Sequence, residues 1–439
     1  MRRSELAGHR LVSSWWGAEK VRTGPLPYIA VLTKRVAPLV ARAQELRLPA
    51  PELDVHDLLA TARRQALLED FGPGDFRPGL DLLVDSINAD VRPDRAGAQL
   101  LRELIGAQLR NRVGVRDWSK KNPDSRIEAI SAPIVICGLP GSGVDLLAGL
   151  IGHDAETRVL RLGEALVTAP PGGALPETYR PDPRSPAVAD LAQRVRRVTV
   201  TGDSGFPEPS LPAGGDVALG GHFFAPLGAA LLGATSYLEW TATADAEPAY
   251  RWQHSVLQAL QACEPTTQWV LHGSAHLGHL DALLAVHPDA RIVWVHRDPA
   301  GTAGHEAALA SRVRGLVTNP SAVTDARAGV SDDRRLSSHL DQLDRAGAVV
   351  QERSLDVLHL HHVELHADPV GTVARIYRRF GLDVPTAARW RMDAWLTRRS
   401  GPTTAGTWNG TALQALAPTD AERRERYLKH REVLPEHAG

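Results

Sequence analysis

Lysine is nearly absent from this chain of 439 residues. Its five lysines stand at positions 20, 34, 120, 121 and 429, and the other 45 of the 50 basic residues are arginines. No lysine occurs between Asn122 and Leu428. That stretch therefore offers no lysine as a ligand for an anion or as a catalytic base.

Cysteine and long apolar runs are scarce as well. Cys137 and Cys263 are the only cysteines, so we expect no disulfide scaffold, and a reducing compartment fits. No apolar run approaches the roughly 20 residues of a membrane span, and the basic N-terminus lacks the apolar stretch of a signal peptide. We therefore predict a cytoplasmic protein without a transmembrane segment.

Positive and negative charges nearly balance in this sequence. The formal net charge is -1, whereas a nucleic-acid-binding surface requires a basic excess, so we expect no nucleic-acid partner. The 43% of hydrophobic residues is enough for a large core in two or three domains.

The beginning of the chain has the pattern of helices. Apolar residues recur at helical spacing over residues 27 to about 46, 56–69, 80–87 and 96–109. The first clear buried strand, Ile134 to Cys137, comes after a polar stretch and Pro133. We predict an all-helical N-terminal region over residues 1–130 and an α/β domain over residues 131–439.

Strands alternate with helices in the second part. Further strands are predicted at 269–272, 291–296 and 357–363, and helices at 144–151, 237–260, 279–286, 302–312, 370–380 and 418–431. The Pro- and Gly-rich stretch 170–221 has little periodicity, and we expect a long excursion on the substrate side. This order predicts a P-loop-like three-layer α/β fold with a central parallel sheet and a ligand at the carboxyl ends of its strands.

A glycine-rich turn follows the first strand. Gly138 and Gly143 keep the G-x-x-x-x-G spacing of a nucleotide-binding P-loop, but Val144 and Asp145 stand where that motif has Lys and Ser/Thr. Backbone N–H groups at the start of the next helix favour an anion. A turn without a ligand is the alternative. A P-loop kinase or NTPase is a distant one, because two of its central parts are missing.

Three ordered blocks resemble the bacterial sulfotransferase family. They read Pro-Ile-Val-Ile-Cys-Gly-Leu-Pro-Gly-Ser-Gly at 133–143, Trp-Val-Leu-His-Gly-Ser-Ala-His-Leu at 269–277, and a segment at 280–299 that ends in His-Arg-Asp-Pro. Members of the family typically read Gly-Leu-Pro-Arg-Ser/Thr-Gly-Thr-Thr, Trp-Val-Leu-Lys-Ser-Pro-x-His-Leu and His-Arg-Asp-Pro there. The resemblance extends from about Leu53 to the end of the chain.

This resemblance implies transfer of a sulfuryl group from 3′-phosphoadenosine 5′-phosphosulfate to a hydroxyl or amine of a small-molecule or lipid acceptor, without a metal. Fixed donors would stabilise the charge on the leaving 5′-phosphate while a base takes the acceptor's proton. The loop positions that match the 5′-phosphosulfate site are Gly138, Pro140, Gly141, Ser142 and Gly143. Arg297 matches a ligand of the 3′-phosphate, and a surface salt bridge is its alternative.

The chain departs from the family pattern at five positions. Gly141 replaces a basic residue, Val144 and Asp145 replace two threonines, His272 replaces a lysine, and His305 replaces a serine. Asp145 adds a repulsion of about 4 kcal/mol to a phosphosulfate, at ~4 Å and an effective dielectric constant near ~20. Protonated His272 and His305 would neutralise it and act as donors to the leaving group.

The resemblance also supplies candidates for the base. Glu164 stands where related sulfotransferases place a glutamate, and it suits a base if burial raises its pKa. His276 matches the family's histidine and is the alternative. An ordinary capping glutamate and a core histidine are the competing interpretations. A divalent metal held by Asp145, His272 and His276 is a further alternative.

Two arginines near the end of the chain complete the predicted site. Arg398 and Arg399 precede Ser-Gly401 and resemble the late Arg-Lys-Gly loop with which cytosolic sulfotransferases cover the nucleotide. A solvated basic turn is the alternative. For the whole protein, the rival hypothesis is a catalytically silent binding or scaffold protein of the same fold. The acceptor and the oligomeric state cannot be inferred from the sequence.

Overall fold

The computed structural model describes residues 50–168, 214–318, 332–399 and 421–431, with a few positions between 186 and 193. The chain divides into two compact units, Met1–Leu46 and Arg47–Gly439, and every described residue belongs to the second. The helix predicted at residues 27–46 and most of the stretch 170–221 lie outside the described residues.

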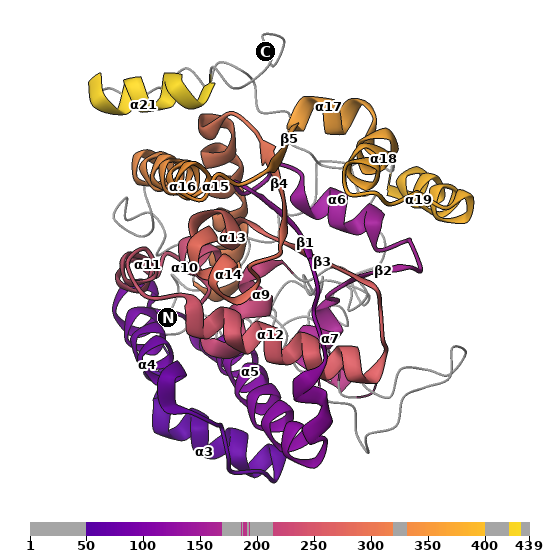
Figure 1. Cartoon of the computed structure of the whole chain (residues 1–439). Coiled ribbons are helices and arrows are strands. Elements are labelled where there is room, and N and C mark those ends of the chain that lie inside the picture. Colours follow the sequence, from indigo (N-terminus) through magenta and orange to yellow (C-terminus); the bar gives the residue numbers. More distant parts are fainter. Residues whose placement is uncertain are drawn as a thin grey trace, which may run out of the picture. The chain divides into compact units, whose positions relative to one another are not determined.

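Five parallel strands form one sheet in the order β2-β3-β1-β4-β5 (Figure 1). They are β1 (Ile134–Gly138), β2 (Thr157–Val159), β3 (Gln268–His272), β4 (Arg291–His296) and β5 (Val357–His361). β1 lies between β3 and β4, with Ile136 paired to His272 and Val293. All carboxyl ends therefore meet at one edge, as the predicted fold class requires. The three-residue β2 was not predicted, and β5 ends at His361 because α17 begins at the next residue.

Helices cover both faces of the sheet. Val135 and Cys137 face a core shared with α12 (Glu247–Cys263), α13 (Ser274–Gly278), α14 (Leu280–Val286) and α16 (Asp332–Glu352). Ile134 and Ile136 face α6 (Val144–Ile151), α18 (Pro369–Arg379) and α19 (Thr386–Arg399). The alternation of side chains along β1 thus builds the three layers that were predicted.

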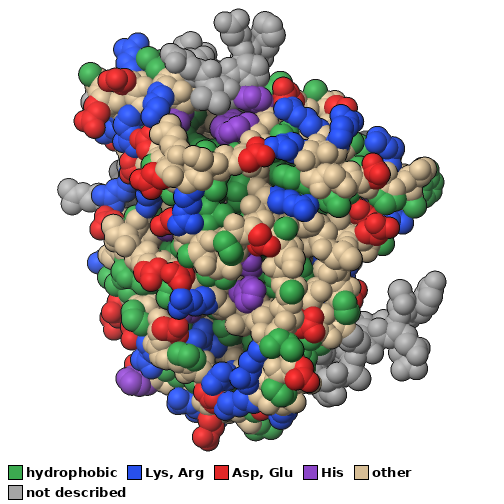
Figure 2. Space-filling model, viewed as in Figure 1, with side chains coloured by type: hydrophobic (Ala, Val, Ile, Leu, Met, Phe, Trp, Pro, Cys, Tyr) green, Lys and Arg blue, Asp and Glu red, His purple; other side chains and the backbone are tan. Residues whose placement is uncertain are grey.

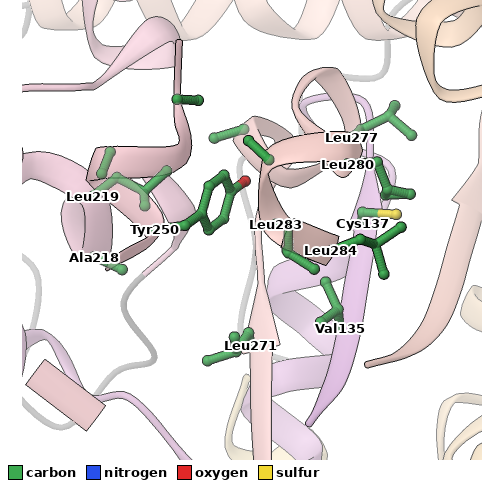
Figure 3. Packing of buried hydrophobic residues seen from close by; sticks show 14 of the residues in the cluster. Val135, Cys137, Ala218, Leu219, Tyr250, Leu271, Leu277, Leu280, Leu283 and Leu284 are labelled. Carbon is green, nitrogen blue, oxygen red and sulfur yellow. The ribbon is translucent and has the colours of Figure 1, made fainter. Parts of the chain in front are cut away.

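Figure 3 shows the first of these cores, where Val135 and Cys137 of β1 lie beside leucines of α13 and α14. The labelled leucines there are Leu277, Leu280, Leu283 and Leu284, and all are buried. Full burial of one such side chain stabilises the fold by roughly 1.5–3 kcal/mol. This packing fixes the carboxyl ends of β1 and β3, where the predicted site residues lie.

The described part of the N-terminal region is helical, as predicted. It contains α3 (Val55–Ala66), α4 (Arg77–Ser86) and α5 (Arg95–Lys121), which runs twelve residues beyond the predicted end at Leu109. These helices share a core with Leu162, Phe223 and Tyr237. The division of the chain at residue 130 stays a prediction.

Further α-helices lie elsewhere in the described residues. They are α7 (Leu162–Leu166), α9 (Gly215–Leu219), α10 (Pro226–Leu232), α11 (Thr235–Thr241), α15 (Pro299–Val317), α17 (His362–Ala367) and α21 (Ala421–Arg431). Within the described ranges, none of the helices is both long and apolar enough to cross a membrane.

Candidate active site

The turn between β1 and α6 is built on three glycines. Gly141 and Gly143 have φ values of 77° and 106°, a region that glycine adopts without strain. A Cβ on Gly138 would lie 2.5 Å from Ser142 Oγ and 2.6 Å from Val295 O. The backbone therefore approaches β4 too closely for a side chain, and the turn ends at the N-terminus of α6, where N–H groups favour an anion.

Arg297 holds this turn from the neighbouring strand. It follows the last residue of β4, and its Nη1 donates a hydrogen bond to Gly141 O at 2.5 Å. Burial lowers the pKa of the guanidinium from its ordinary value, while the nearby Asp298 raises it. The described hydrogen bond of Arg297 thus goes to the loop, in contrast to the surface salt bridge that was its alternative.

Three histidines from three elements surround the same turn. The ring of His305 lies against Gly141, because a Cβ there would be 2.5 Å from His305 Cδ2. His362 Nδ1 is 2.9 Å from Ser142 O and must carry a proton to donate to it. Burial lowers the pKa of both histidines, that of His362 to about 4. His272 is the third, at the end of β3.

Asp145 lies among these histidines. His272 Nε2 is 3.3 Å from Asp145 Oδ1, although the angle does not suit a hydrogen bond, and the Asp145 side chain is 80% exposed. Within the described ranges, no three His, Cys, Asp or Glu side chains lie together as a metal site requires. The alternative ligand set of Asp145, His272 and His276 is therefore not formed.

Residues of the turn line two cavities. Leu139 and Arg297 line the larger one, of about 1150 Å³, together with residues of β4, β5, α16 and α21. Pro140 lines the smaller one, of about 250 Å³, together with residues of α10, α11, α13, α15 and α16. In Figure 2 histidine side chains gather near the top of the view, between α21 and α17 of Figure 1. Adjacent loop residues thus face two separate spaces, as a reaction between two substrates needs.

Comparison with known proteins identifies the family. The model of the sulfotransferase family matches residues 133–386, more than half of the chain. The chain belongs to the sulfotransferase family. Among solved structures it is similar to sulfotransferase STF9 from Mycobacterium avium, with 23% identity and a TM-score of 0.73 over 88% of this chain and 98% of that one. It is also similar to sulfotransferase STF1 from Mycobacterium tuberculosis H37Rv, with 24% identity and a TM-score of 0.68 over 85% and 98%. No curated protein matches the sequence.

Glu164, the glutamate predicted from the sulfotransferase pattern, lies in α7 and is 2% exposed. Arg158 Nη2 is 2.8 Å from its Oε1, and Arg161 N donates to its Oε2 at 3.0 Å. Both oxygens therefore have partners in the fold, which is the capping arrangement weighed against a catalytic role. A role as the base stays a prediction.

His276, the motif histidine, is fully buried in α13. Its Nδ1 is 3.0 Å from Tyr250 Oη, and Nε2 has no hydrogen-bond partner among the described residues. Gly215 lies against the ring, since a Cβ there would be 3.4 Å from Nε2. Burial, reinforced by the nearby His272, lowers the pKa of His276 to about 3. The imidazole is neutral near pH 7 and enclosed on its Nε2 side.

Arg398 is not brought to the loop. It is an exposed residue of α19, and its charge adds to burial in lowering the pKa of His153, beyond the carboxyl end of α6. The eight residues of α6 separate that end from Gly143 by about 12 Å. Arg399 ends the same helix, and its side chain lies outside the described residues.

His362 was missed by the sequence reasoning. It follows β5 directly, and the rule that ligands gather at the carboxyl ends of parallel strands would have indicated it. The predicted strand ran on to Val363, which placed His362 inside a strand and hid this signal.

Proposed function

We propose that this sulfotransferase-family protein transfers a sulfuryl group from 3′-phosphoadenosine 5′-phosphosulfate to a hydroxyl or amine of a small-molecule or lipid acceptor. The observation that carries the proposal is the glycine turn, whose residues line two cavities and whose Gly141 is bonded by Arg297. In this proposal the phosphosulfate lies at the turn, the nucleoside enters the larger cavity, and the acceptor comes from the other side.

The larger cavity has walls that suit a nucleotide. The rings of Trp294 and His296 are stacked, with centroids 5.0 Å apart and an interplanar angle of 17°, and offer a flat surface to a base. Arg424 and Lys429 of α21 also line this cavity. Lys429 lies just beyond the lysine-free stretch. Its ammonium group is available to a nucleotide in the larger cavity. Arg297 is the proposed ligand of the 3′-phosphate.

Charge at the turn has to change when the donor binds. The carboxylate of Asp145 repels a phosphosulfate, and we expect protons on His272 and His305 to compensate for it. The same imidazoles then donate hydrogen bonds to the oxygen that leaves sulfur and so stabilise its developing charge. Of these two histidines, His272 stands where this family typically carries a lysine, and His305 stands where it typically carries a serine.

Calorimetric titration with adenosine 3′,5′-bisphosphate, the product nucleotide, tests the proposal. We expect binding by the unmodified protein and a loss of affinity of about 10- to 100-fold in Arg297→Ala, as for a charged hydrogen bond. Arg353→Ala is the matched control, because Arg353 is an exposed arginine that lines neither cavity.

Absence of both heat and thermal stabilisation at millimolar nucleotide would contradict the proposal. That outcome would favour the alternative, a catalytically silent protein that uses the sulfotransferase fold for binding. Magnesium-dependent ATP hydrolysis that is lost on changes in the turn would instead favour a P-loop kinase or NTPase.

A further inference from the structure

We propose that the smaller cavity binds the acceptor, and that His279 is the general base that takes its proton. The cavity fits a compact hydroxylated molecule with an aromatic or alicyclic body and one hydrogen-bond-accepting group. The inference rests on the proposed function in one respect, because it requires a sulfuryl donor at the glycine turn.

The smaller cavity adjoins the turn and is lined by two kinds of wall. Pro140 of the turn and Ala275 of α13 are among the residues that line it. One wall is apolar and comes from α10 and α11, with Pro226, Leu227, Ala230 and Leu238. The other wall is polar and comes from α15 and α16. An apolar wall opposite a polar one offers a small molecule both packing and hydrogen-bond partners.

His279 lies between α13 and α14 and is one of the residues that line this cavity. His279 is 8% exposed, and its ring packs edge-on against the ring of Phe224, with the two centroids 4.9 Å apart. No described residue forms a hydrogen bond with its ring. Burial, together with the charge of Arg345, lowers its pKa to about 4, while Asp281 opposes this. A neutral imidazole with an available lone pair therefore faces the acceptor.

The motif histidine is less suited to the same task. Tyr250 occupies Nδ1 of His276, and Gly215 covers the side on which Nε2 lies. His279 is three residues further along the chain and lines a cavity that His276 does not. The histidine that lines the cavity is therefore His279, between α13 and α14, and not the motif residue His276.

The polar wall indicates what else the acceptor carries. Arg335 and Glu306 form a buried ion pair, and His339 Nε2 lies 2.9 Å from the second oxygen of Glu306. Arg335 is 3% exposed, and its Nε has no hydrogen-bond partner among the described residues. A buried N–H without a hydrogen-bond partner is energetically unfavourable. An acceptor that offers an oxygen to this group relieves part of that cost.

The reaction balances with these groups. The acceptor oxygen attacks sulfur, a new O–S bond forms, and the bond from sulfur to the bridging oxygen of the 5′-phosphate breaks. The hydroxyl proton passes to a ring nitrogen of His279, and adenosine 3′,5′-bisphosphate leaves. His279 then releases its proton to solvent.

The test uses p-nitrophenol as acceptor and radiolabelled 3′-phosphoadenosine 5′-phosphosulfate as donor. We expect His279→Gln to lower kcat at least 100-fold, as for a general base, with unchanged calorimetric affinity for adenosine 3′,5′-bisphosphate. Added imidazole should restore part of the rate of His279→Ala, which a purely structural role would not allow. His254→Gln is the control, because His254 also has a lowered pKa but lines neither cavity.

A second variant tests the cavity. Ala230→Leu narrows the apolar wall and should raise the KM for p-nitrophenol at least tenfold while nucleotide affinity stays the same. An unchanged kcat in His279→Gln overturns the base, and an unchanged KM in Ala230→Leu overturns the acceptor site. Nucleotide binding without transfer to p-nitrophenol overturns the proposed acceptor class. A wild-type protein that binds no nucleotide overturns the proposed function, and this inference with it.

Discussion

Two departures from the family pattern touch each other. Gly141 stands where relatives carry a basic residue, and His305 stands where they carry a serine. In the structure the His305 ring occupies the space into which a side chain at Gly141 would extend. We interpret the two residues as one replacement, in which an imidazole from α15 supplies the donor that the turn has lost.

This pairing predicts the outcome of restoring the family's residue. Gly141→Arg alone should weaken nucleotide binding, because the new side chain meets the ring of His305. In addition, an arginine at a φ of 77° is strained by about 1–3 kcal/mol. Gly141→Arg with His305→Ser should bind more tightly than Gly141→Arg, by tenfold or more in calorimetry. Equal affinity in a folded single and double variant would contradict the pairing.

Glu164 offers a second prediction for a single residue. Glu164→Gln should lower the free energy of unfolding by about 1–3 kcal/mol, because Arg158 loses its buried counter-ion and keeps only the exposed carboxylate of Glu264, at 3.4 Å. Urea denaturation measures this. The double variant Arg158→Met with Glu164→Leu is the control and should recover most of the loss. A variant as stable as the unmodified protein would show that the ion pair does not support α7.

At the scale of elements, ionic contacts with α16 hold α21 at the larger cavity, which residues of α21 line. Arg426 donates to Asp341 and Asp344, both at 2.7 Å, and His430 Nε2 is 2.9 Å from Asp344 Oδ1. Tyr427 Oη donates to Asp298, which caps the start of α15 beside Arg297. These contacts keep the basic side chains of α21 at the cavity.

Loosening α21 should therefore weaken nucleotide binding. We expect Arg426→Met to lower the affinity for adenosine 3′,5′-bisphosphate about 3- to 10-fold, since two ionic contacts with α16 are lost. Arg379→Met removes an exposed ion pair with Asp356 that lines neither cavity, and it should leave the affinity unchanged. An equal loss of nucleotide affinity in Arg426→Met and Arg379→Met would contradict a specific role of α21 in nucleotide binding.

At the scale of the whole molecule, buried neutral histidines make the fold sensitive to acid. Burial lowers the pKa to about 3 for His276 and His296, and to about 4 for His222, His279 and His287. Between these values and the ordinary pKa near 6.5, the unfolded chain binds more protons than the folded one. The stability that these groups confer is complete above pH 6.5 and is lost as the pH falls toward 4.

The melting temperature should accordingly fall as the pH is lowered from 7 to 5. Each such histidine adds a slope of up to about 1.4 kcal/mol per pH unit below its unfolded pKa. Calorimetric melting at several pH values measures this, and His287→Gln should reduce the slope. A melting temperature that stays constant between pH 7 and pH 5 would contradict the prediction.

The sequence alone determined the parallel sheet, the glycine turn and the position of Arg297 directly after a strand. These depend on local chemistry, namely apolar runs that form strands and a backbone that only glycine can adopt at Gly141 and Gly143. The rule that carboxyl ends of parallel strands share an edge then brings the strand ends together. The resemblance of three sequence blocks to family motifs predicted the family, which the alternation of strands and helices alone could not do.

Only the tertiary structure decided which polar groups are available. Glu164 and His276 match the family pattern, yet one is held by Arg158 and the other by Tyr250. His279 and His362 lie outside the motifs but face a cavity or the turn. Accessibility, ion pairing and pKa depend on residues distant in the chain that pack against each group, and local sequence does not specify them.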